Sequence, residues 1–251
     1  MKKTVAIILC IIMIFSFCAC KNDNQSTTAS YTEKTNGDET TLTVPEVDET
    51  LNASENDSSK SGKAEVAAIA KKYFDVDLNN EDNFYYSDMN AYIQTSADEI
   101  EIEVDGESLQ FGMSYNKVLA KGFSLVSSEY ADEQMKGLVV VCDFKNTAGK
   151  VVGLGFNADE NETLKDGVLR LVRCDGSDSQ KYANVTVNHI GMDSSIEDII
   201  SVFGDSIHTL SVVYGKYLSI KYFSEARALC VEFVIDPETE NIYEIRVTDN
   251  R

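Results

Sequence analysis

The side chains best suited to acid–base or nucleophilic chemistry in this chain are its two histidines and its many serines. His189 and His208 each stand beside isoleucine at the predicted start of a helix or a strand, which is more typical of structural histidines than of a general base. The sequence contains no Gly-Xaa-Ser-Xaa-Gly pattern, and no glycine-rich phosphate loop precedes a predicted helix. We therefore predict no catalytic residues and no cofactor.

A calcium loop is suggested only in part by the spacing of Asp75, Asp77 and Asn79. Its sixth position would be Asn80, where the loop needs glycine, and its twelfth would be Tyr86, where it needs glutamate. No cysteine or histidine spacing matches a zinc site either. We predict no metal site. A pair of carboxylates for glycoside hydrolysis is an open alternative, because the chain has 42 Asp and Glu residues. Against it, the chain has no tryptophan for stacking on a sugar ring.

The first twenty residues have the pattern of an export signal. Lys2 and Lys3 precede an apolar run, residues 5–17, that is too short to cross a hydrocarbon core of about 30 Å as a helix. The run ends in Phe-Cys-Ala before Cys20, and a polar stretch follows at once. This junction resembles the lipobox of bacterial lipoproteins.

The resemblance implies a lipid anchor and an address outside the cytoplasm. In that family the cysteine thiol receives a diacylglycerol and the chain is cut just before it, so Met1–Ala19 would be the signal peptide and Cys20 the lipid attachment site. Several acyl chains on one cysteine hold a protein stably at a membrane, at roughly 0.8 kcal/mol per buried methylene. We expect a protein anchored to the cell membrane that faces outward.

The cysteines that follow this signal are Cys142, Cys174 and Cys230. An odd number of thiols is not fully paired within one chain. A disulfide between Cys142 and Cys174 and two buried free thiols are both compatible with the strand-like apolar runs around them.

Charge and composition separate a tether from a folded part. The formal net charge is −20 and no basic stripe is present, which excludes a nucleic-acid partner and favours either a solvated surface or a basic partner. Residues 20–62 are rich in Ser, Thr, Asn and acids, so we expect a disordered acidic tether there. Residues 63–251 are long enough for one large domain or two small ones.

The folded part begins with a helix and continues as strands. Apolar residues spaced along Ala64–Phe74 form one stripe, which predicts an amphipathic helix. Alternation from Ile100 to Val104, the turn Asp105-Gly106, and a return through Leu109 predict a hairpin.

Two similar segments suggest an internal duplication. Gly112-Met113 and Gly191-Met192 each open a short helix that ends at a glycine, Gly122 or Gly204. For the second helix, the spacing of Ser194 and Glu197 predicts a capping box. Strands joined by short turns follow each helix, and such connections favour antiparallel meanders. The predicted strands are 138–145, 151–156 and 168–174, then 209–214, 217–223, 229–235 and 242–248.

These elements predict an α+β fold in which short helices pack on antiparallel meander sheets. We expect two similar units in tandem, an N-terminal unit at 63–180 and a C-terminal unit at 181–251. The Gly-Met opening, the helix ending in Phe203-Gly204 and the strand at 231–235 resemble the β-lactamase inhibitory protein fold, which outer-membrane assembly lipoproteins of the SmpA/OmlA type share. The resemblance implies that an exposed sheet face holds a protein partner.

Alternation along the last four strands divides their side chains between two faces. One face is apolar and should cover the helix; we assign to it Leu210, Val212, Leu218, Ile220, Leu229, Val231, Phe233, Ile235, Tyr243, Ile245 and Val247. The other face carries aromatic and charged residues of the kinds found at binding hot spots. We predict that the partner-binding residues are Tyr217, Lys221, Phe223, Glu232 and Arg246. The alternative is an ordinary solvated sheet face with cross-strand pairs among Lys221, Glu232, Glu244 and Arg246.

Three functions follow, in order of preference. The first is a membrane-anchored, non-catalytic module that binds or inhibits a protein. The second is a lipoprotein that binds a ligand or transport substrate, which would need a deep pocket. The third is an envelope hydrolase, which would need convergent polar residues with perturbed protonation.

Overall fold

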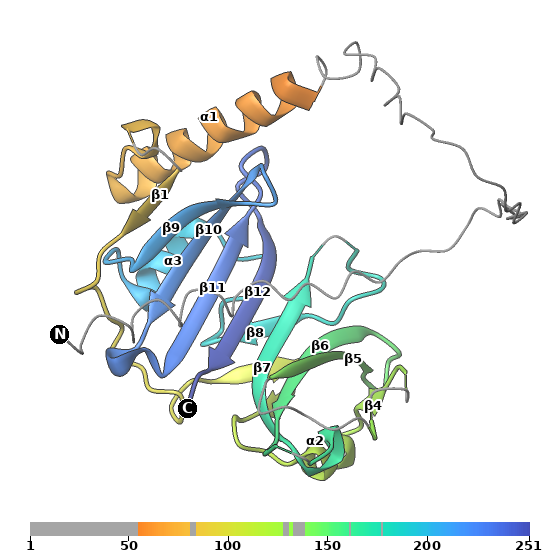
Figure 1. The fold of residues 1–251 in the computed structure, drawn as a ribbon. Helices are drawn as coiled ribbons and strands as arrows, with labels where there is room; N and C mark the ends of the chain where they lie inside the picture. Colours follow the sequence, from red (N-terminus) through yellow and green to blue (C-terminus); the bar gives the residue numbers. More distant parts are fainter. Residues whose placement is uncertain (1–54, 81–83, 128–130, 133–138, 161, 177) are drawn as a thin grey trace, which may run out of the picture. The chain divides into compact units, whose positions relative to one another are not determined.

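The computed structural model of the chain describes residues 55–80, 84–127, 131–132, 139–160, 162–176 and 178–251 (Figure 1). Residues 55–251 belong to one compact unit. The expected signal peptide, Cys20 and the tether as far as residue 54 lie outside the described residues. Among the described helices, none is long and apolar enough to cross a membrane.

Within the described residues, an antiparallel sheet of nine strands dominates the fold. Its order is β1-β9-β10-β11-β12-β7-β6-β5-β4. The strands are β1 (Tyr85–Ser87), β4 (Ser124–Leu125), β5 (Val140–Lys145), β6 (Val151–Asn157), β7 (Val168–Asp175), β9 (Thr209–Val213), β10 (Tyr217–Phe223), β11 (Leu229–Ile235) and β12 (Ile242–Asp249). A smaller antiparallel sheet has the order β3-β2-β8, with β2 (Ile102–Val104), β3 (Glu107–Leu109) and β8 (Val185–Val187).

The α+β class and the long strands agree with the sequence prediction. Asp105 and Gly106 have positive φ angles of 49° and 86°, as expected for the tight turn between β2 and β3. Both sheets cross the boundary predicted at residue 180, because β7 pairs with β12 and β2 pairs with β8. The segments 63–180 and 181–251 therefore share their sheets and one hydrophobic core.

Three α-helices accompany the sheets in the described part of the chain: α1 (Glu55–Phe74), α2 (Tyr115–Ala120) and α3 (Ile196–Phe203). Short 3-10 turns occur at η3 (Leu78–Asn80), η5 (Leu164–Asp166) and η6 (Glu225–Arg227). Figure 1 shows α3 behind strands β9 to β11, and α1 also packs against β9 and β10. Their apolar faces join the core through side chains such as Val66, Ala70, Ile196 and Ile199.

Two predicted helix starts are corrected by the structure. Helix α1 begins at Glu55 rather than Ala64, so it includes residues that we had assigned to the tether. Once a packed turn has formed, each further residue adds a hydrogen bond at small cost, and this favours such an extension.

The capping box of α3 is shifted by one residue from its predicted position. Ser195 Oγ accepts from the Asp198 amide at 3.1 Å, and Asp198 Oδ2 accepts from the Ser195 amide at 2.9 Å. Ser194 and Glu197 offer the same spacing, so the sequence allows two registers. The burial of Ile196 and Ile199 accompanies the observed one.

Among the described residues, Cys142, Cys174 and Cys230 form no disulfide. Cys142 on β5 is in register with Leu154 on β6, which is in register with Val172 on β7. Cys174 is therefore two strands away and displaced along the sheet, beyond the reach of a disulfide. Of the two alternatives, buried thiols without a disulfide are the ones observed.

Candidate functional site

The five predicted binding residues lie on the sheet face opposite the core. On β10, the core residues Leu218 and Ile220 alternate with Tyr217, Lys221 and Phe223. Lys221 is directly opposite Glu232 on β11, and Glu232 is directly opposite Arg246 on β12. The predicted face thus exists, and three of its members are cross-strand neighbours.

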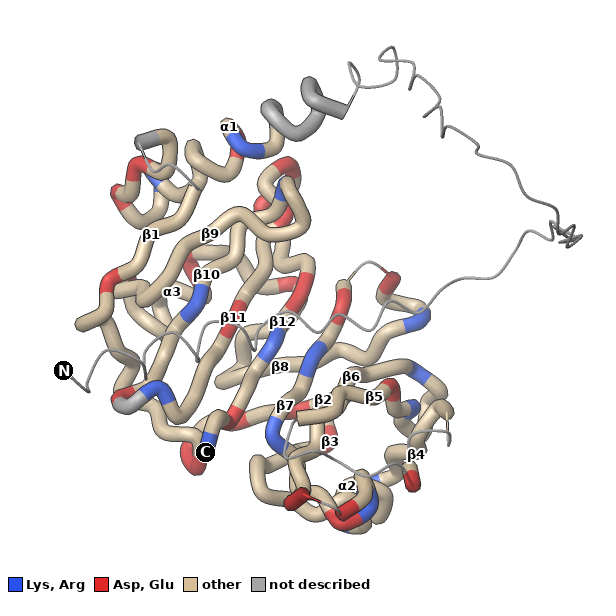
Figure 2. The backbone as a smooth tube through the Cα atoms, viewed as in Figure 1, with Lys and Arg blue, Asp and Glu red and all other residues tan. Residues whose placement is uncertain are grey.

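These neighbours belong to a larger charged cluster, made of Lys221, Glu232, Arg246, Glu244 and Arg173 (Figure 2). Glu232 Oε1 forms an ion pair with Lys221 Nζ at 3.3 Å, and Glu232 Oε2 accepts from Arg246 Nη1 at 3.1 Å. Glu244 Oε1 accepts from Arg246 Nη2 at 2.6 Å and forms an ion pair with Arg173 Nε at 3.1 Å. A single connected network therefore crosses four strands.

Two hydroxyl groups complete the hydrogen bonding of the carboxylates. Ser219 Oγ donates to Glu232 Oε1 at 2.7 Å, and Tyr214 Oη donates to Glu244 Oε2 at 3.0 Å. Arg173 Nη2 also donates to Glu244 Oε2 at 3.2 Å, so this ion pair includes one charge-assisted hydrogen bond.

Burial is uneven within the charged cluster. The side chains of Glu232 and Glu244 are 6% and 0% exposed, whereas those of Arg246 and Arg173 are 31% and 39% exposed. Burial disfavours the charged Arg246 guanidinium, but the two carboxylates more than offset this and hold its pKa above the ordinary value. Long cationic side chains thus lie over the acids. The charge pairs of our alternative prediction are thus present, although their two acids are buried beneath the cations rather than solvated.

A tyrosine cluster, made of Tyr214, Tyr217 and Tyr243, adjoins the charged cluster. The rings of Tyr217 and Tyr243 stack at 4.3 Å, and Tyr214 meets Tyr217 edge-on at 6.3 Å. Burial, followed by the nearby Asp175 carboxylate, raises the pKa of Tyr243 to about 12. Tyr214 is the exposed member at 49%, whereas Tyr217 is 9% exposed.

The placement of Tyr243 corrects our sequence assignment to the core face. A register shift between Val234 and Ile235 makes Ile242 the partner of Ile235. This β-bulge brings Ile242 into the core and leaves Tyr243 stacked on Tyr217 at the opposite face.

Phe223 lies at the other end of β10, away from the tyrosine cluster. Its ring contacts His208 at 4.6 Å, and Arg227 lies 5.9 Å from its centroid. The predicted residues are therefore divided: the charged trio forms one network, while Tyr217 and Phe223 belong to clusters at opposite ends. Sequence reasoning missed Arg173 and Tyr214, because Arg173 reaches this face only through the pairing of β7 with β12.

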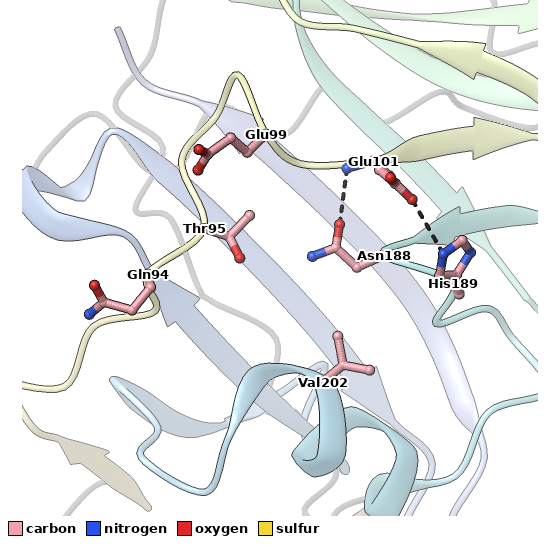
Figure 3. A pocket seen from close by; sticks show the side chains of 7 residues that line it. All are labelled: Gln94, Thr95, Glu99, Glu101, Asn188, His189 and Val202. Atoms are coloured by element: carbon pink, nitrogen blue, oxygen red, sulfur yellow. Dashed lines mark hydrogen bonds and ion pairs between the residues drawn. The ribbon is translucent and has the colours of Figure 1, made fainter.

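An open cavity of about 560 Å³ lies elsewhere, beside α3 (Figure 3). It is lined by the segment from Gln94 to Glu101, by the turn at Asn188 and His189, and by Val202. Asn188 Oδ1 accepts from the Glu101 amide at 2.9 Å, and His189 Nε2 lies 3.3 Å from a Glu101 carboxylate oxygen. The His189 side chain is 84% exposed, so solvent weakens this pair.

A second cavity, of about 490 Å³, lies where the segment from Gly176 to Asn184 passes the start of β12. Cys174 is at its wall, with Sγ donating to the Ala183 carbonyl at 2.8 Å. Burial raises the pKa of this thiol to about 11, so it stays protonated and unreactive at neutral pH.

The described residues hold no group of three or more His, Cys, Asp or Glu side chains placed to bind a metal ion. At the partial calcium pattern, Asp75 forms an ion pair with Lys71, and Asp77 Oδ1 accepts from the Asn79 amide at 3.1 Å. These contacts belong to the end of a helix and a tight turn.

Comparison with protein-family models, with curated proteins and with solved structures found no match to this chain. The resemblances to bacterial lipoproteins and to the β-lactamase inhibitory protein fold therefore stay predictions from sequence. The geometry of the charged and tyrosine clusters is the basis on which function is argued.

Proposed function

We propose that this chain is a lipid-anchored, non-catalytic protein-binding module of the cell envelope. Cys20 carries the lipid, and residues 21–54 connect the anchor to the folded part. A random chain of this length has a root-mean-square reach of roughly 30–35 Å. That reach lets a folded domain meet partners near the membrane surface.

The partner binds, in this proposal, on the charged face beside Tyr214. The observation that carries it is the uneven burial of the charged cluster, because the acids are covered while the side chains of Arg173 and Arg246 are partly exposed. A chain of net charge −20 thus presents guanidinium groups next to an exposed tyrosine. Arginine and tyrosine are enriched at the energetic centres of protein interfaces.

The chemistry of this surface indicates a partner protein that presents carboxylates. A guanidinium group can donate two parallel hydrogen bonds to a carboxylate. The phenol of Tyr214 offers apolar area with a polar tip. Asp175, in register with Glu244, lies at the border of the cluster and limits the cationic surface to the arginine side. The expected contact is therefore compact and centred on Tyr214 and Arg173.

Site-specific photocrosslinking in intact cells tests this proposal. A photoreactive residue is placed at Tyr214 in the full chain, and the matched control is placed at Val202, which is 44% exposed on α3. We expect a crosslinked protein from position 214 only, weakened severalfold by Arg173→Gln, which keeps a hydrogen bond to Glu244 but loses the charge. Equal crosslinking from both positions, or no effect of Arg173→Gln, contradicts the proposal.

The lipid anchor is tested separately by metabolic labelling with a fatty-acid analogue. The wild-type chain should carry label and sediment with membranes, and Cys20→Ser should do neither. Labelling that persists in Cys20→Ser overturns the anchor without affecting the binding surface.

We also infer that the fold contains two related halves. In each half a short helix, α2 or α3, is followed by four strands, β4 to β7 or β9 to β12. The last strands of the two meanders, β7 and β12, are neighbours, so apart from the edge strand β1 the order reads alike from both directions. This arrangement supports a duplication. We expect a chain that carries only one half to form a homodimer.

A further inference from the structure

His208 is a buried imidazole at the beginning of β9. The residue is 4% exposed. Its Nδ1 lies 2.9 Å from Thr209 Oγ1, and among the described residues its Nε2 has no hydrogen-bond partner. In either tautomer, the protonated ring would carry an Nε2–H donor and a positive charge that no described residue satisfies.

The surroundings of His208 favour the neutral ring. The Phe223 and Tyr92 rings lie 4.6 Å and 6.1 Å from it. Burial, and then the nearby Arg227 guanidinium, lower the pKa of His208, while the Asp88 carboxylate opposes them.

The Lys221 carbonyl accepts a hydrogen bond from the His208 amide at 3.1 Å. The Lys221 ammonium is paired with Glu232 on the charged face. The charged groups that bear on the imidazole are therefore Asp88 and Arg227.

One short segment, Asp88–Ile93, lies against this imidazole through the Tyr92 ring. The Asp88 amide donates to the His208 carbonyl at 2.9 Å, and the Ile93 amide donates to the Phe223 carbonyl at 2.9 Å. Between these two bonds, Tyr92 contributes a ring contact to His208. Ile93 is 8% exposed, so its side chain anchors the far end.

We propose that His208 is an acid-sensitive latch: protonation of its imidazole releases the segment Asp88–Ile93 from the ends of β9 and β10. The latch is independent of the proposed partner surface. Opening exposes the imidazole to water, where its positive charge is solvated, and it removes the two main-chain hydrogen bonds that fix the segment.

The direction of the effect follows from linkage. The closed state has the lower histidine pKa, so it is favoured above the ordinary value of about 6.5 and loses stability relative to the open state as pH falls below that value. At low pH, the population of the open state rises about tenfold for each unit by which the histidine pKa of the open state exceeds that of the closed state. A protein facing outward meets such a pH change directly.

Hydrogen exchange of the full chain tests the latch. Exchange at Asp88 and Ile93 is compared at pH 7.5 and pH 5.0 after correction for intrinsic rates. We expect the corrected exchange to rise severalfold at pH 5.0 at these two amides and to stay unchanged at the β11 amides. In His208→Gln, which is uncharged at both values, the pH dependence should vanish.

A second variant protects the test against a folding defect. Arg227→Gln removes the neighbouring positive charge and also a contact to Met89 Sδ at 2.8 Å, so its exchange at pH 5.0 is compared with its own exchange at pH 7.5. The acid-induced rise should shrink without vanishing, because the charged imidazole then meets less repulsion. Direct titration of the His208 ring by NMR should give a midpoint below 6.5 in the folded chain. An ordinary midpoint, or a rise that persists in His208→Gln, overturns the proposal.

Discussion

The two faces of strands β10 to β12 are both buried, but by different means. The core face excludes water with apolar side chains such as Ile220, Phe233 and Ile245, each 0% exposed. The charged face buries the carboxylates of Glu232 and Glu244 to a similar depth beneath cations. Burial alone therefore does not distinguish a core from a candidate binding face; the partners of the buried atoms do.

The faces should respond differently to substitution. An apolar core loses transfer energy and gains a cavity when a side chain shrinks. When one partner of a buried ion pair is replaced, the other charge stays buried without compensation, and this is destabilising. The intact ionic network itself contributes little net stability. This contrast yields three predictions.

The largest expected effect is on the core face. Phe233 packs against the Phe203 ring at 5.4 Å and the Tyr222 ring at 6.4 Å, so Phe233→Ala should lower the free energy of unfolding by about 3–5 kcal/mol. Urea denaturation followed by circular dichroism measures it. Phe233→Leu is the control and should lose less than half as much. Equal losses would mean that cavity formation is not the dominant cost.

The next effect is on the charged face. Arg246→Met removes the guanidinium shared by Glu232 and Glu244, and we expect a loss of about 2 kcal/mol in the free energy of unfolding. This is less than for a fully enclosed pair, because Lys221 and Arg173 stay and water reaches the site.

Arg246→Lys, which keeps the charge, serves as the matched control for that substitution. It should recover part of the loss, measured by the same urea titration. A stability of Arg246→Met equal to the wild type would show that the two remaining cations suffice.

The smallest effect concerns a single neutral donor. Ser219→Ala leaves Glu232 Oε1 without its 2.7 Å hydrogen bond and should cost about 1 kcal/mol in the free energy of unfolding. Ser211, its cross-strand neighbour on β9, provides the comparison, and Ser211→Ala should change stability by no more than about 0.5 kcal/mol. Thermal denaturation of both variants resolves the difference, and equal shifts would remove Ser219 from the network.

The elements with strong local signals were predictable from the sequence. Strands β10, β11 and β12 follow from alternation bounded by turn residues, and their observed limits differ from the predicted ones by at most one residue. The short strands β1, β4 and β8 were missed. Each has two or three residues and is defined mainly by a partner distant in sequence, which leaves no local pattern.

The candidate site was predictable only in its inner part. Alternation placed Lys221, Glu232 and Arg246 together, and the structure confirms that they are neighbours. Arg173 reaches this face through the pairing of β7 with β12. Tyr243 reaches it through the bulge between β11 and β12.

By itself, then, the sequence determined the α+β class, the long strands and which face of the last meander is apolar, because side-chain alternation and turn chemistry are local properties. Only the tertiary structure decided that β7 and β12 join the two meanders into one sheet. It also decided that Glu232, Glu244 and His208 are buried. Burial of a polar group depends on which distant side chains cover it, and that is set by the packing of the whole fold.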